Sequence, residues 1–223
     1  MEQEDRGIRE PKRPYDARRR RERAEEERAA TRQRVALAAR HLFLERGYAA
    51  TTMADVAREA GVALQSVYNA GQSKAELLHL VVDLAVAGDP EEVMLLDRPS
   101  YAAIADEPSA KRQVEMIADL IAAVMERLAP VWVAYREAAA VDPKAAANLV
   151  AAHQRRHETF TGMIGMLPQD RLRRPLAESV DSAWAIGSVD VYLLFRTARG
   201  WDHADYSTWL RNTLADQLLV PAP

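Results

Sequence analysis

Residues 51–78 read TTMADVAREAGVALQSVYNAGQSKAELL, and this stretch decides the fold. Its apolar residues at helical spacing are Met53, Val56, Ala57 and Ala60. Thr52, with Asp55 three residues on, forms an acidic variant of the capping box that opens a helix, and Gly61 suits the left-handed position that closes one. The pattern therefore predicts a helix of about eight residues between two strong boundary signals.

The flanking residues add two more helices to this short one. After the Gly61–Val62 turn, a second short helix is predicted from residue 63 or 64 to about residue 69. Ser73 and Glu76 form a capping box for the helix that follows. On the N-terminal side, one apolar helix face ends near Gly47 and consists of Val35, Ala38, Ala39, Leu42 and Phe43. Three helices with a tight turn between the second and third form a compact unit.

A short helix, a glycine turn and a second short helix on such a unit form the helix-turn-helix arrangement, whose second helix lies in the DNA major groove. Here the sequence resembles the TetR family of transcriptional regulators, without a gap against the family pattern. The resemblance is specific over about residues 31–83 and more general beyond them, where residues 200–201 and 206–210 resemble one branch of the family. The matching residues are Ala39, Leu42, Phe43, Gly47, Tyr48, Thr51, Thr52, Asp55, Val56, Ala57, Ala60, Gly61, Val62, Val67, Tyr68 and residues 73–78.

The resemblance implies an all-α fold in which a three-helix helix-turn-helix unit precedes a larger helical bundle for ligand binding and dimerisation. It further implies a homodimeric repressor that binds a pseudo-palindromic double-stranded DNA operator and is released by a small apolar effector. The alternative is a helical-bundle small-molecule-binding protein or enzyme with a degenerate helix-turn-helix. Two departures keep it open: Ala63 stands where the family has an N-capping Ser, and residues 69–71 replace an aromatic pair.

Composition and length exclude other classes of protein. The 223 residues are 48% hydrophobic and include no Cys, which excludes thiol catalysis and Cys-ligated zinc. The richest apolar run, residues 77–87, is interrupted by His79 and Asp83 and is too short to span a bilayer. The N-terminus lacks the pattern of a secretory signal, so a cytoplasmic location is expected by default. Neither a Gly-rich phosphate loop nor a GxSxG elbow occurs, so neither an enzyme nor a cofactor is predicted.

The distribution of charge indicates an anionic partner at the N-terminal end. The first 74 residues carry 16 Lys and Arg against 12 Asp and Glu, a net charge of +4, whereas residues 75–223 carry 14 against 21, a net charge of −7. We predict three parts. They are a disordered charged arm over residues 1–30, whose Arg/Glu stretch can extend the first helix; a helix-turn-helix domain over 31–76, continuing into a linker helix over 74–87; and a ligand-binding and dimerisation domain over 88–220.

Proline and capping signals divide this C-terminal part into further helices. Asp89–Pro90 and Arg98–Pro99 punctuate a connecting segment. A long helix from about Val114 is predicted to stop before Pro130, which suits the first position of a shorter helix. Asp142–Pro143 then caps the next long helix.

Candidates for DNA contact lie on the second short helix and in the basic arm. Gln and Asn suit bidentate contacts with adenine edges, whereas Tyr, Thr, Lys and Arg reach phosphates. Alternatively, these residues have no role in binding, and the short helix presents an ordinary solvated face and the arm is a solvated tail. The candidates are Arg18, Arg19, Arg20, Arg21, Arg32, Thr52, Gln65, Ser66, Tyr68, Asn69 and Lys74.

The C-terminal part holds all four Trp, and its aromatic and Met residues are candidates for a ligand pocket or, alternatively, ordinary core. His153 and His157 lie one helical turn apart. They are candidates for polar anchors of a ligand or, alternatively, are hydrogen-bonded histidines of the core or surface. Two such imidazoles can share a metal, but no motif supplies a third ligand, so no metal site is predicted. The ligand candidates are Met116, Ile121, Trp132, Tyr135, Arg136, His153, His157, Trp184 and Tyr192.

Residues 180–195, with the final helices, are predicted to pair two copies of the chain. The small residues Ala183 and Gly187, one turn apart, would let two helices approach closely. Alternatively, Gly187 marks the break between two helices of one chain. The interface candidates are Val180, Ala183, Trp184, Gly187, Val191 and Leu194.

Overall fold

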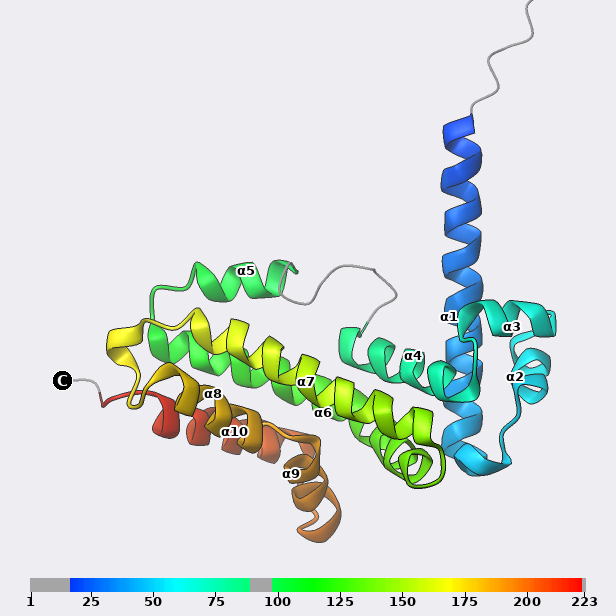
Figure 1. The fold of residues 1–223 in the computed structure, drawn as a ribbon. Helices are drawn as coiled ribbons and strands as arrows, with labels where there is room; N and C mark the ends of the chain where they lie inside the picture. The colour runs from blue at the N-terminus through cyan, green and yellow to red at the C-terminus, as the bar shows by residue number, and fades with distance from the viewer. Residues whose placement is uncertain (1–16, 89–97, 222–223) are drawn as a thin grey trace, which may run out of the picture.

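The computed structural model describes residues 17–88 and 98–221, which form an all-α protein with no strand in either range. Figure 1 shows a small group of helices at one end and a larger bundle extending from it. The small group contains α1 (Ala17–Ala50), α2 (Met53–Ala60), α3 (Leu64–Ala70) and α4 (Lys74–Ala87). The bundle contains α5 (Pro99–Ala105), α6 (Ala110–Val141), α7 (Pro143–Gly165), α8 (Leu176–Ile186), α9 (Val189–Leu193) and α10 (His203–Leu218).

Two short non-α turns complete the bundle. A 3-10 turn, Gln169–Arg171, follows α7, and a π-helical turn, Leu194–Ala198, follows α9. The predicted punctuation at Asp89–Pro90 lies outside the described residues, whereas Pro99 occupies the first turn of α5.

The boundary signals of the helix-turn-helix are confirmed. The Thr52 hydroxyl accepts from the backbone N–H of Asp55, and the Asp55 carboxylate accepts from the backbone N–H of Thr52, which completes the capping box of α2. Gly61 ends α2 in the left-handed conformation, with φ of 63°. The Ser73 hydroxyl accepts from the N–H of Glu76 at the start of α4. Ala63 precedes α3 without a side-chain cap.

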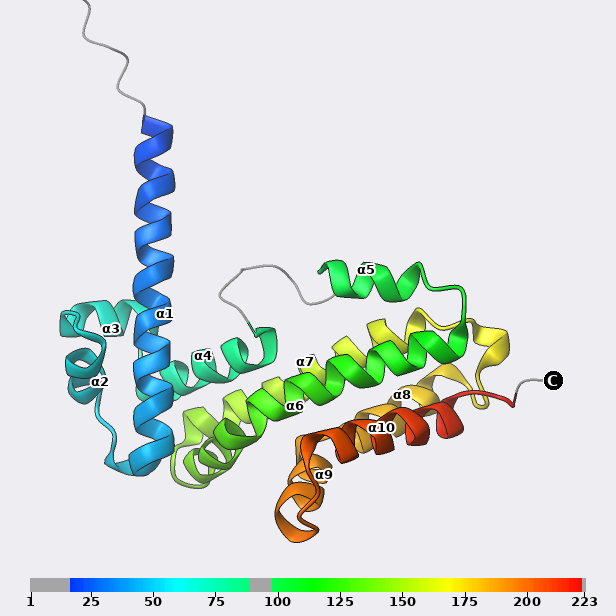
Figure 2. The same cartoon turned by 180° about the vertical axis from the view of Figure 1, so that it is seen from behind.

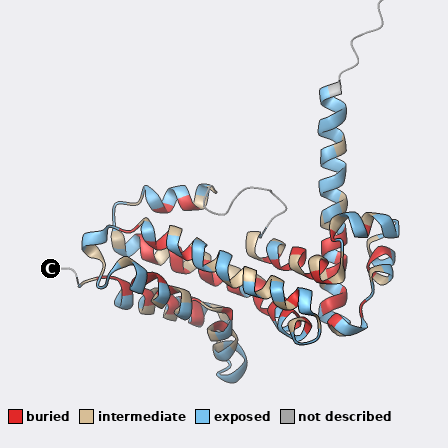
Figure 3. Ribbon diagram, viewed as in Figure 1, coloured by how far each residue is buried: buried red, intermediate tan, exposed pale blue. Residues whose placement is uncertain are grey.

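The N-terminal half of α1 contains the Arg/Glu stretch of the charged arm. Residues 17–30 are helical, so this stretch extends the first helix, whereas residues 1–16 lie outside the described residues. Ala, Arg and Glu are strong helix formers, and Arg18 pairs with Glu22 one turn on at 2.9 Å. Figure 3 shows this half exposed, and burial begins only at Val35. Gly47, with φ of 79° and ψ of 167°, breaks the helical path where the sequence predicts the end.

Helix α6 is the central element of the bundle and contacts α1, α4, α7 and α10. Seen from behind in Figure 2, α6 lies in front of α7, with α10 beside it. The buried residues of α6 repeat along its full length and include Val114, Ile117, Ile121, Met125, Leu128, Trp132, Tyr135 and Ala138. This helix therefore joins the helix-turn-helix unit to the rest of the protein.

The prediction that a helix stops before Pro130 is wrong, because α6 continues through it to Val141. A proline inside a helix removes one backbone N–H and crowds the carbonyl four residues earlier, that of Glu126. Both Pro130 and Glu126 face solvent, so water can solvate this carbonyl. Leu128 and Trp132, on either side of the proline, are both 4% exposed, and their packing holds the helix together.

A polar junction fixes the helix-turn-helix against the bundle. The Tyr48 hydroxyl donates to Oδ2 of Asp142 at 2.5 Å, and Oδ1 of Asp142 accepts from the N–H of Lys144 at 2.9 Å, which confirms Asp142 as the cap of α7. Lys144 also pairs with Glu76 of α4 at 2.6 Å. The Lys74 ammonium donates to the Tyr48 carbonyl at 2.8 Å. The end of α1 and the starts of α4 and α7 thus meet at one place.

Gly71 should be required by the close approach of α3 to α4. A Cβ at this position would lie 2.8 Å from the backbone N and 2.9 Å from the Cα of Leu77, closer than real Cβ contacts. Gly71→Ala should therefore lower the free energy of unfolding by about 1–3 kcal/mol, measured by urea denaturation at fixed protein concentration. Gly165→Ala is the matched control, since a Cβ there meets nothing within 4 Å. Equal stabilities of the two variants would contradict the steric argument.

Candidate functional site

The polar face of α3 lies on the surface. Gln65 and Asn69 are exposed one turn apart, and Gln65 Nε2 donates to Asn69 Oδ1 at 3.1 Å. Ser66 is partly buried, and Tyr68 is 42% exposed. Val67, on the opposite side, is fully buried and anchors the helix. The structure therefore presents the predicted base-reading side chains together on one accessible face.

The predicted phosphate contacts are spread around this face. Lys74 lies over the Tyr48 ring, 4.3 Å from its centroid, so its ammonium is already held within the junction. Thr52 is exposed and caps α2. Arg32 is exposed on α1; burial raises the pKa of Asp83 on α4, and the charges of His79, Arg155 and Arg32 offset part of this rise. The arginines at positions 18–21 lie in the first turn of α1, and their side chains are exposed.

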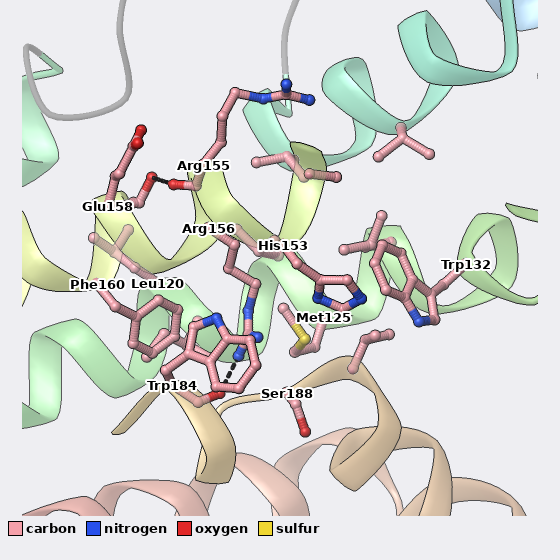
Figure 4. Close-up of a pocket in the computed structure, with 18 of the residues that line it drawn as sticks. Leu120, Met125, Trp132, His153, Arg155, Arg156, Glu158, Phe160, Trp184 and Ser188 are labelled. Carbon is pink, nitrogen blue, oxygen red and sulfur yellow. Dashed lines mark hydrogen bonds between the residues drawn. The ribbon is translucent and has the colours of Figure 1, made fainter. Parts of the chain in front are cut away.

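A cavity of about 660 Å³ lies within the bundle, bounded by α4, α5, α6, α7, α8 and the start of α9. Figure 4 shows Trp132, His153, Arg156, Phe160 and Trp184 around it. Its lining is largely apolar: the aliphatic and Met residues are Val82, Val86, Ala87, Leu120, Ile121, Val124, Met125, Leu128, Ala152, Met163, Ala185 and Val189. A concave apolar site with a few polar groups is the usual form of a small-molecule pocket.

The structure places four of the nine predicted ligand residues on the cavity wall: Ile121, Trp132, His153 and Trp184. The other five lie elsewhere. Tyr135 is fully buried and bonded to His79, and Arg136 pairs with Asp190 at 2.8 Å. His157 is exposed and pairs with Asp181 at 3.0 Å. Met116 is partly buried and packs against the hydrophobic core, and Tyr192 packs edge-on to Tyr206.

Four nitrogens around the cavity are buried without a hydrogen-bond partner among the described residues. We call them the inner nitrogen cluster: Trp132 Nε1, His153 Nδ1, Arg156 Nε and Trp184 Nε1. Leaving a buried polar group unsatisfied costs about 1–3 kcal/mol, so such groups are rare in a core that serves only stability. All four belong to side chains that line the cavity, and each nitrogen is itself covered by neighbouring atoms, whereas five further unpartnered atoms lie elsewhere in the described residues.

Arg156 is a cavity residue that the sequence patterns did not indicate. Its guanidinium lies 4.8 Å from the Phe160 ring and 4.9 Å from the Trp184 ring, and it donates to the Trp184 carbonyl. Burial lowers its pKa to about 10. An Arg normally indicates a solvated helix face. The available signal was spacing, because positions 153, 156, 160 and 163 fall on one face of α7.

The other charged residues lie at the exposed side of the cavity. The side chains of Asp83 and Asp190 are both 54% exposed, and that of Arg155 is 50% exposed. Asp190 is paired with Arg136, and Asp83 lies 3.6 Å from His79. Figure 4 shows Arg155 and Glu158 extending away from the aromatic rings, whereas Arg156 turns toward Trp184. Arg156 is therefore the charged side chain directed at the rings, whereas Asp190 and Asp83 lie at the exposed side, where partial burial still raises the pKa of Asp83.

A chain of rings connects the cavity to α4. Trp184 and Trp132 both pack edge-on to His153, at 6.2 and 5.4 Å between centroids, and Trp132 packs on Tyr135 at 5.8 Å. The Tyr135 hydroxyl lies 3.0 Å from Nδ1 of His79 on α4. Because Arg155 donates to Nε2 of His79 at 2.7 Å, neutral His79 carries its proton on Nδ1 and donates to Tyr135.

Most of the predicted dimer contacts are used inside the protomer. Val180 is 2% exposed and Ala183 is fully buried. A Cβ on Gly187 would lie 3.1 Å from Ile121 and Phe160, so this glycine packs against its own bundle and ends α8. Trp184 lines the cavity, and Val191 is partly buried. Leu194, 60% exposed, is the member of this set that is open to a partner.

Residues 17–88 and 98–221 contain neither a metal-binding cluster nor a membrane-spanning helix. Within these ranges, no three His, Asp or Glu side chains are grouped to hold a metal ion. No helix in the same ranges has the length and apolar character needed to cross a membrane.

The α2–turn–α3 motif on an all-α scaffold defines a helix-turn-helix DNA-binding protein. The family model described as bacterial regulatory proteins, tetR family, matches residues 37–81, which run from the second half of α1 into α4. The match covers the helix-turn-helix end of the chain, so residues 37–81 are similar to the N-terminal domain of the tetR family of transcriptional regulators. No curated protein matches its sequence.

Solved structures share the fold over most of the chain. A transcriptional regulator from Saccharomonospora viridis, in complex with choline, has a TM-score of 0.61 and 16% identity over 85% of this chain and 98% of that chain. FadR from Bacillus subtilis, in complex with stearoyl-CoA, has a TM-score of 0.62 and 14% identity over 83% and 98%. NalD, a repressor of a Pseudomonas aeruginosa multidrug efflux pump, has a TM-score of 0.57 and 18% identity over 85% and 96%.

Acidification should destabilise the protein partly through His153. Burial, and then the charge of Arg156, lower the pKa of this imidazole below its ordinary value. Below about pH 6.5 the unfolded chain therefore takes up a proton that the folded protein resists, so the free energy of unfolding falls with falling pH. In His153→Phe this fall between about pH 7 and pH 5 should be shallower. Urea denaturation at several pH values in this range measures the free energy of unfolding. If its dependence on pH is the same in His153→Phe as in the wild type, His153 does not cause the loss of stability.

Proposed function

We propose that this protein is a ligand-responsive transcriptional repressor that binds a pseudo-palindromic operator as a homodimer and is released by a small, largely apolar effector. The tetR-family match and the exposed polar face of α3 support DNA binding. The cavity supports effector binding, and so do the choline and stearoyl-CoA complexes of proteins with the same fold. A regulator of chromosomal DNA acts in the cytoplasm, which is the location we propose.

The observation that carries this proposal is the double role of α4. Its last turns contribute Val82, Asp83 and Val86 to the cavity wall. Its first residue, Lys74, holds the Tyr48 carbonyl at the end of α1. A ligand that moves the cavity end of α4 would therefore act on the helix-turn-helix through one rigid element.

The function needs two copies of the chain. Each protomer carries one α3, and two recognition helices must lie about 34–36 Å apart to enter successive major grooves. A ligand that prefers a different spacing lowers DNA affinity by its differential affinity for the two spacings, commonly about 1–3 kcal/mol. The partner surface includes Leu194, whose exposed side chain lies beside the end of α9. Light scattering of the wild type and of Leu194→Asp tests this surface.

The direct test is binding to the DNA that flanks the gene of this protein. Fluorescence anisotropy at several salt concentrations should show specific, salt-sensitive binding that a cavity ligand reduces. Specific binding that no cavity ligand alters would contradict release by an effector. Ligand binding without any specific DNA binding would favour the second candidate, a small-molecule-binding protein with a degenerate helix-turn-helix. The uncapped start of α3 at Ala63 is the observation on which that candidate rests.

Gln65→Ala and Asn69→Ala should each weaken specific binding by about 1–3 kcal/mol and leave non-specific binding nearly unchanged. The two side chains are bonded to each other, so their effects should not add in the double variant. Competition titrations with operator and random DNA measure the ratio of specific to non-specific affinity. Gln217→Ala, an exposed change on α10, is the control. Unchanged ratios in both single variants would remove these residues from base recognition.

Deleting residues 1–28 should weaken binding to all DNA sequences alike. The deletion removes Arg18–Arg21 and Arg23, whereas the first buried side chain is Val35, so the remainder should fold normally. The slope of log affinity against log salt concentration should become shallower by about 0.9 for each phosphate that the shortened protein no longer neutralises. An unchanged slope, with circular dichroism confirming the fold, would show that these arginines do not bind phosphates.

A further inference from the structure

We propose that the effector is an amphipathic carboxylate, whose apolar part fills the cavity and whose anionic end is bound by Arg156 and the inner nitrogen cluster. That this ligand acts as an effector rests on the proposed function. Its chemical class rests on the cavity alone. Three features of the cavity define the ligand class: the donors inside it, the state of Arg156, and the placement of the acids.

The inner nitrogen cluster offers donors and lacks acceptors. The indole nitrogens of Trp132 and Trp184 and Nε of Arg156 can only donate a hydrogen bond, and Nδ1 of His153 can donate in one tautomer. None of these four atoms has a partner within the described residues. A carboxylate only accepts hydrogen bonds and has two oxygens to do so, which makes it complementary to such a group.

Arg156 is a buried cation that forms no ion pair within the described residues, although the charge of Asp190 acts on it from a longer distance. No carboxylate within the described ranges lies at ion-pair distance from its guanidinium, which is held by two ring faces and one backbone carbonyl. Burial has lowered the pKa of Arg156, so an anion beside it would recover stabilisation that burial has removed. Arg is also the side chain best suited to bind a carboxylate with two parallel hydrogen bonds.

The same arrangement disfavours a cationic ligand. Aromatic faces commonly bind organic cations, but Arg156 already covers the faces of Phe160 and Trp184 and adds a like charge beside them. The acids at the exposed side offer little compensation, because Asp190 is paired with Arg136 and the Asp83 side chain is 54% exposed. The rest of the wall is largely aliphatic and includes Val82 on α4 and Met163 on α7, which suits an alkyl or aryl body.

The test compares ligands of equal length that differ only in the head group. Decanoate, 1-decanol and decyltrimethylammonium are titrated against the full-length protein while Trp fluorescence is recorded, and 1-naphthylacetate is compared with 1-naphthylethanol. Each carboxylate should bind about tenfold or more tightly than its neutral analogue, because a charge-assisted hydrogen bond is stronger than a neutral one. If neither carboxylate binds more tightly than its alcohol, or if the ammonium compound binds best, the inference is overturned.

Variants connect the head-group preference to the cluster. Arg156→Gln should lower decanoate affinity about tenfold or more and leave decanol affinity within about twofold. Should Arg156→Gln fail to fold, Trp184→Phe, which removes one N–H and keeps an aromatic ring, should weaken decanoate binding selectively. Gln154→Ala, which changes an exposed residue of α7 off the cavity wall, should leave both affinities unchanged. An equal decrease of decanoate and decanol affinity in the Arg156 and Trp184 variants would contradict the anion site.

DNA binding separates the two proposals. Decanoate that binds the cavity and releases operator DNA supports both. Decanoate that binds with the expected head-group preference and leaves operator binding unchanged overturns release by an effector but supports the carboxylate site. Release of operator by decanol as readily as by decanoate supports the proposed function and overturns the inference.

Discussion

The hydroxyl of Tyr48 and the carboxylate of Asp142, 94 positions apart in the chain, are joined by a hydrogen bond of 2.5 Å. The same carboxylate caps α7 through the N–H of Lys144. One side chain therefore fixes the start of α7 and holds the end of α1 beside it. Gly47 turns the chain out of α1 immediately before Tyr48, and the ammonium of Lys74 then covers the Tyr48 ring. The bond also holds the pKa of Asp142 below its ordinary value, which keeps the cap charged. The orientation of the helix-turn-helix relative to the bundle depends on this contact.

The bundle combines a conventional core with a cavity that is poorly satisfied. Tyr135, Leu210 and Leu214 are fully buried, as expected for a structural core. In the cavity wall, indole and guanidinium nitrogens are buried without partners among the described residues. Each such group lowers the stability of the protein by about 1–3 kcal/mol, whereas apolar replacements would remove that cost. The cost is largest at Arg156, because its charge is buried as well, and the proposed anion site would offset it.

Local signals in the sequence predicted the helix-turn-helix correctly, because each acts within about four residues. The Thr52–Asp55 box, the left-handed Gly61 and the caps at Ser73 and Asp142 all form as expected. Features decided by packing between distant helices could not be predicted in this way. Pro130 stays inside α6 because neighbours from other helices hold it, and Ala183 packs inside its own protomer. The cavity was predicted only in part, since a residue such as Arg156 is assigned to solvent unless its neighbours in space are known.

The exposed half of α1 has a consequence that depends on its being a helix. A flexible basic tail tolerates insertions and deletions, because its charges reach the same phosphates after a small rearrangement. In a helix each residue adds about 1.5 Å of length and about 100° of rotation. Four consecutive residues at this rotation point to all sides of the axis, so the arginines at positions 18–21 place positive charge around the whole helix. The number of residues between Arg23 and Val35 therefore sets how far along the axis this charge lies from α3, and the removal of one residue would shorten that distance by about 1.5 Å.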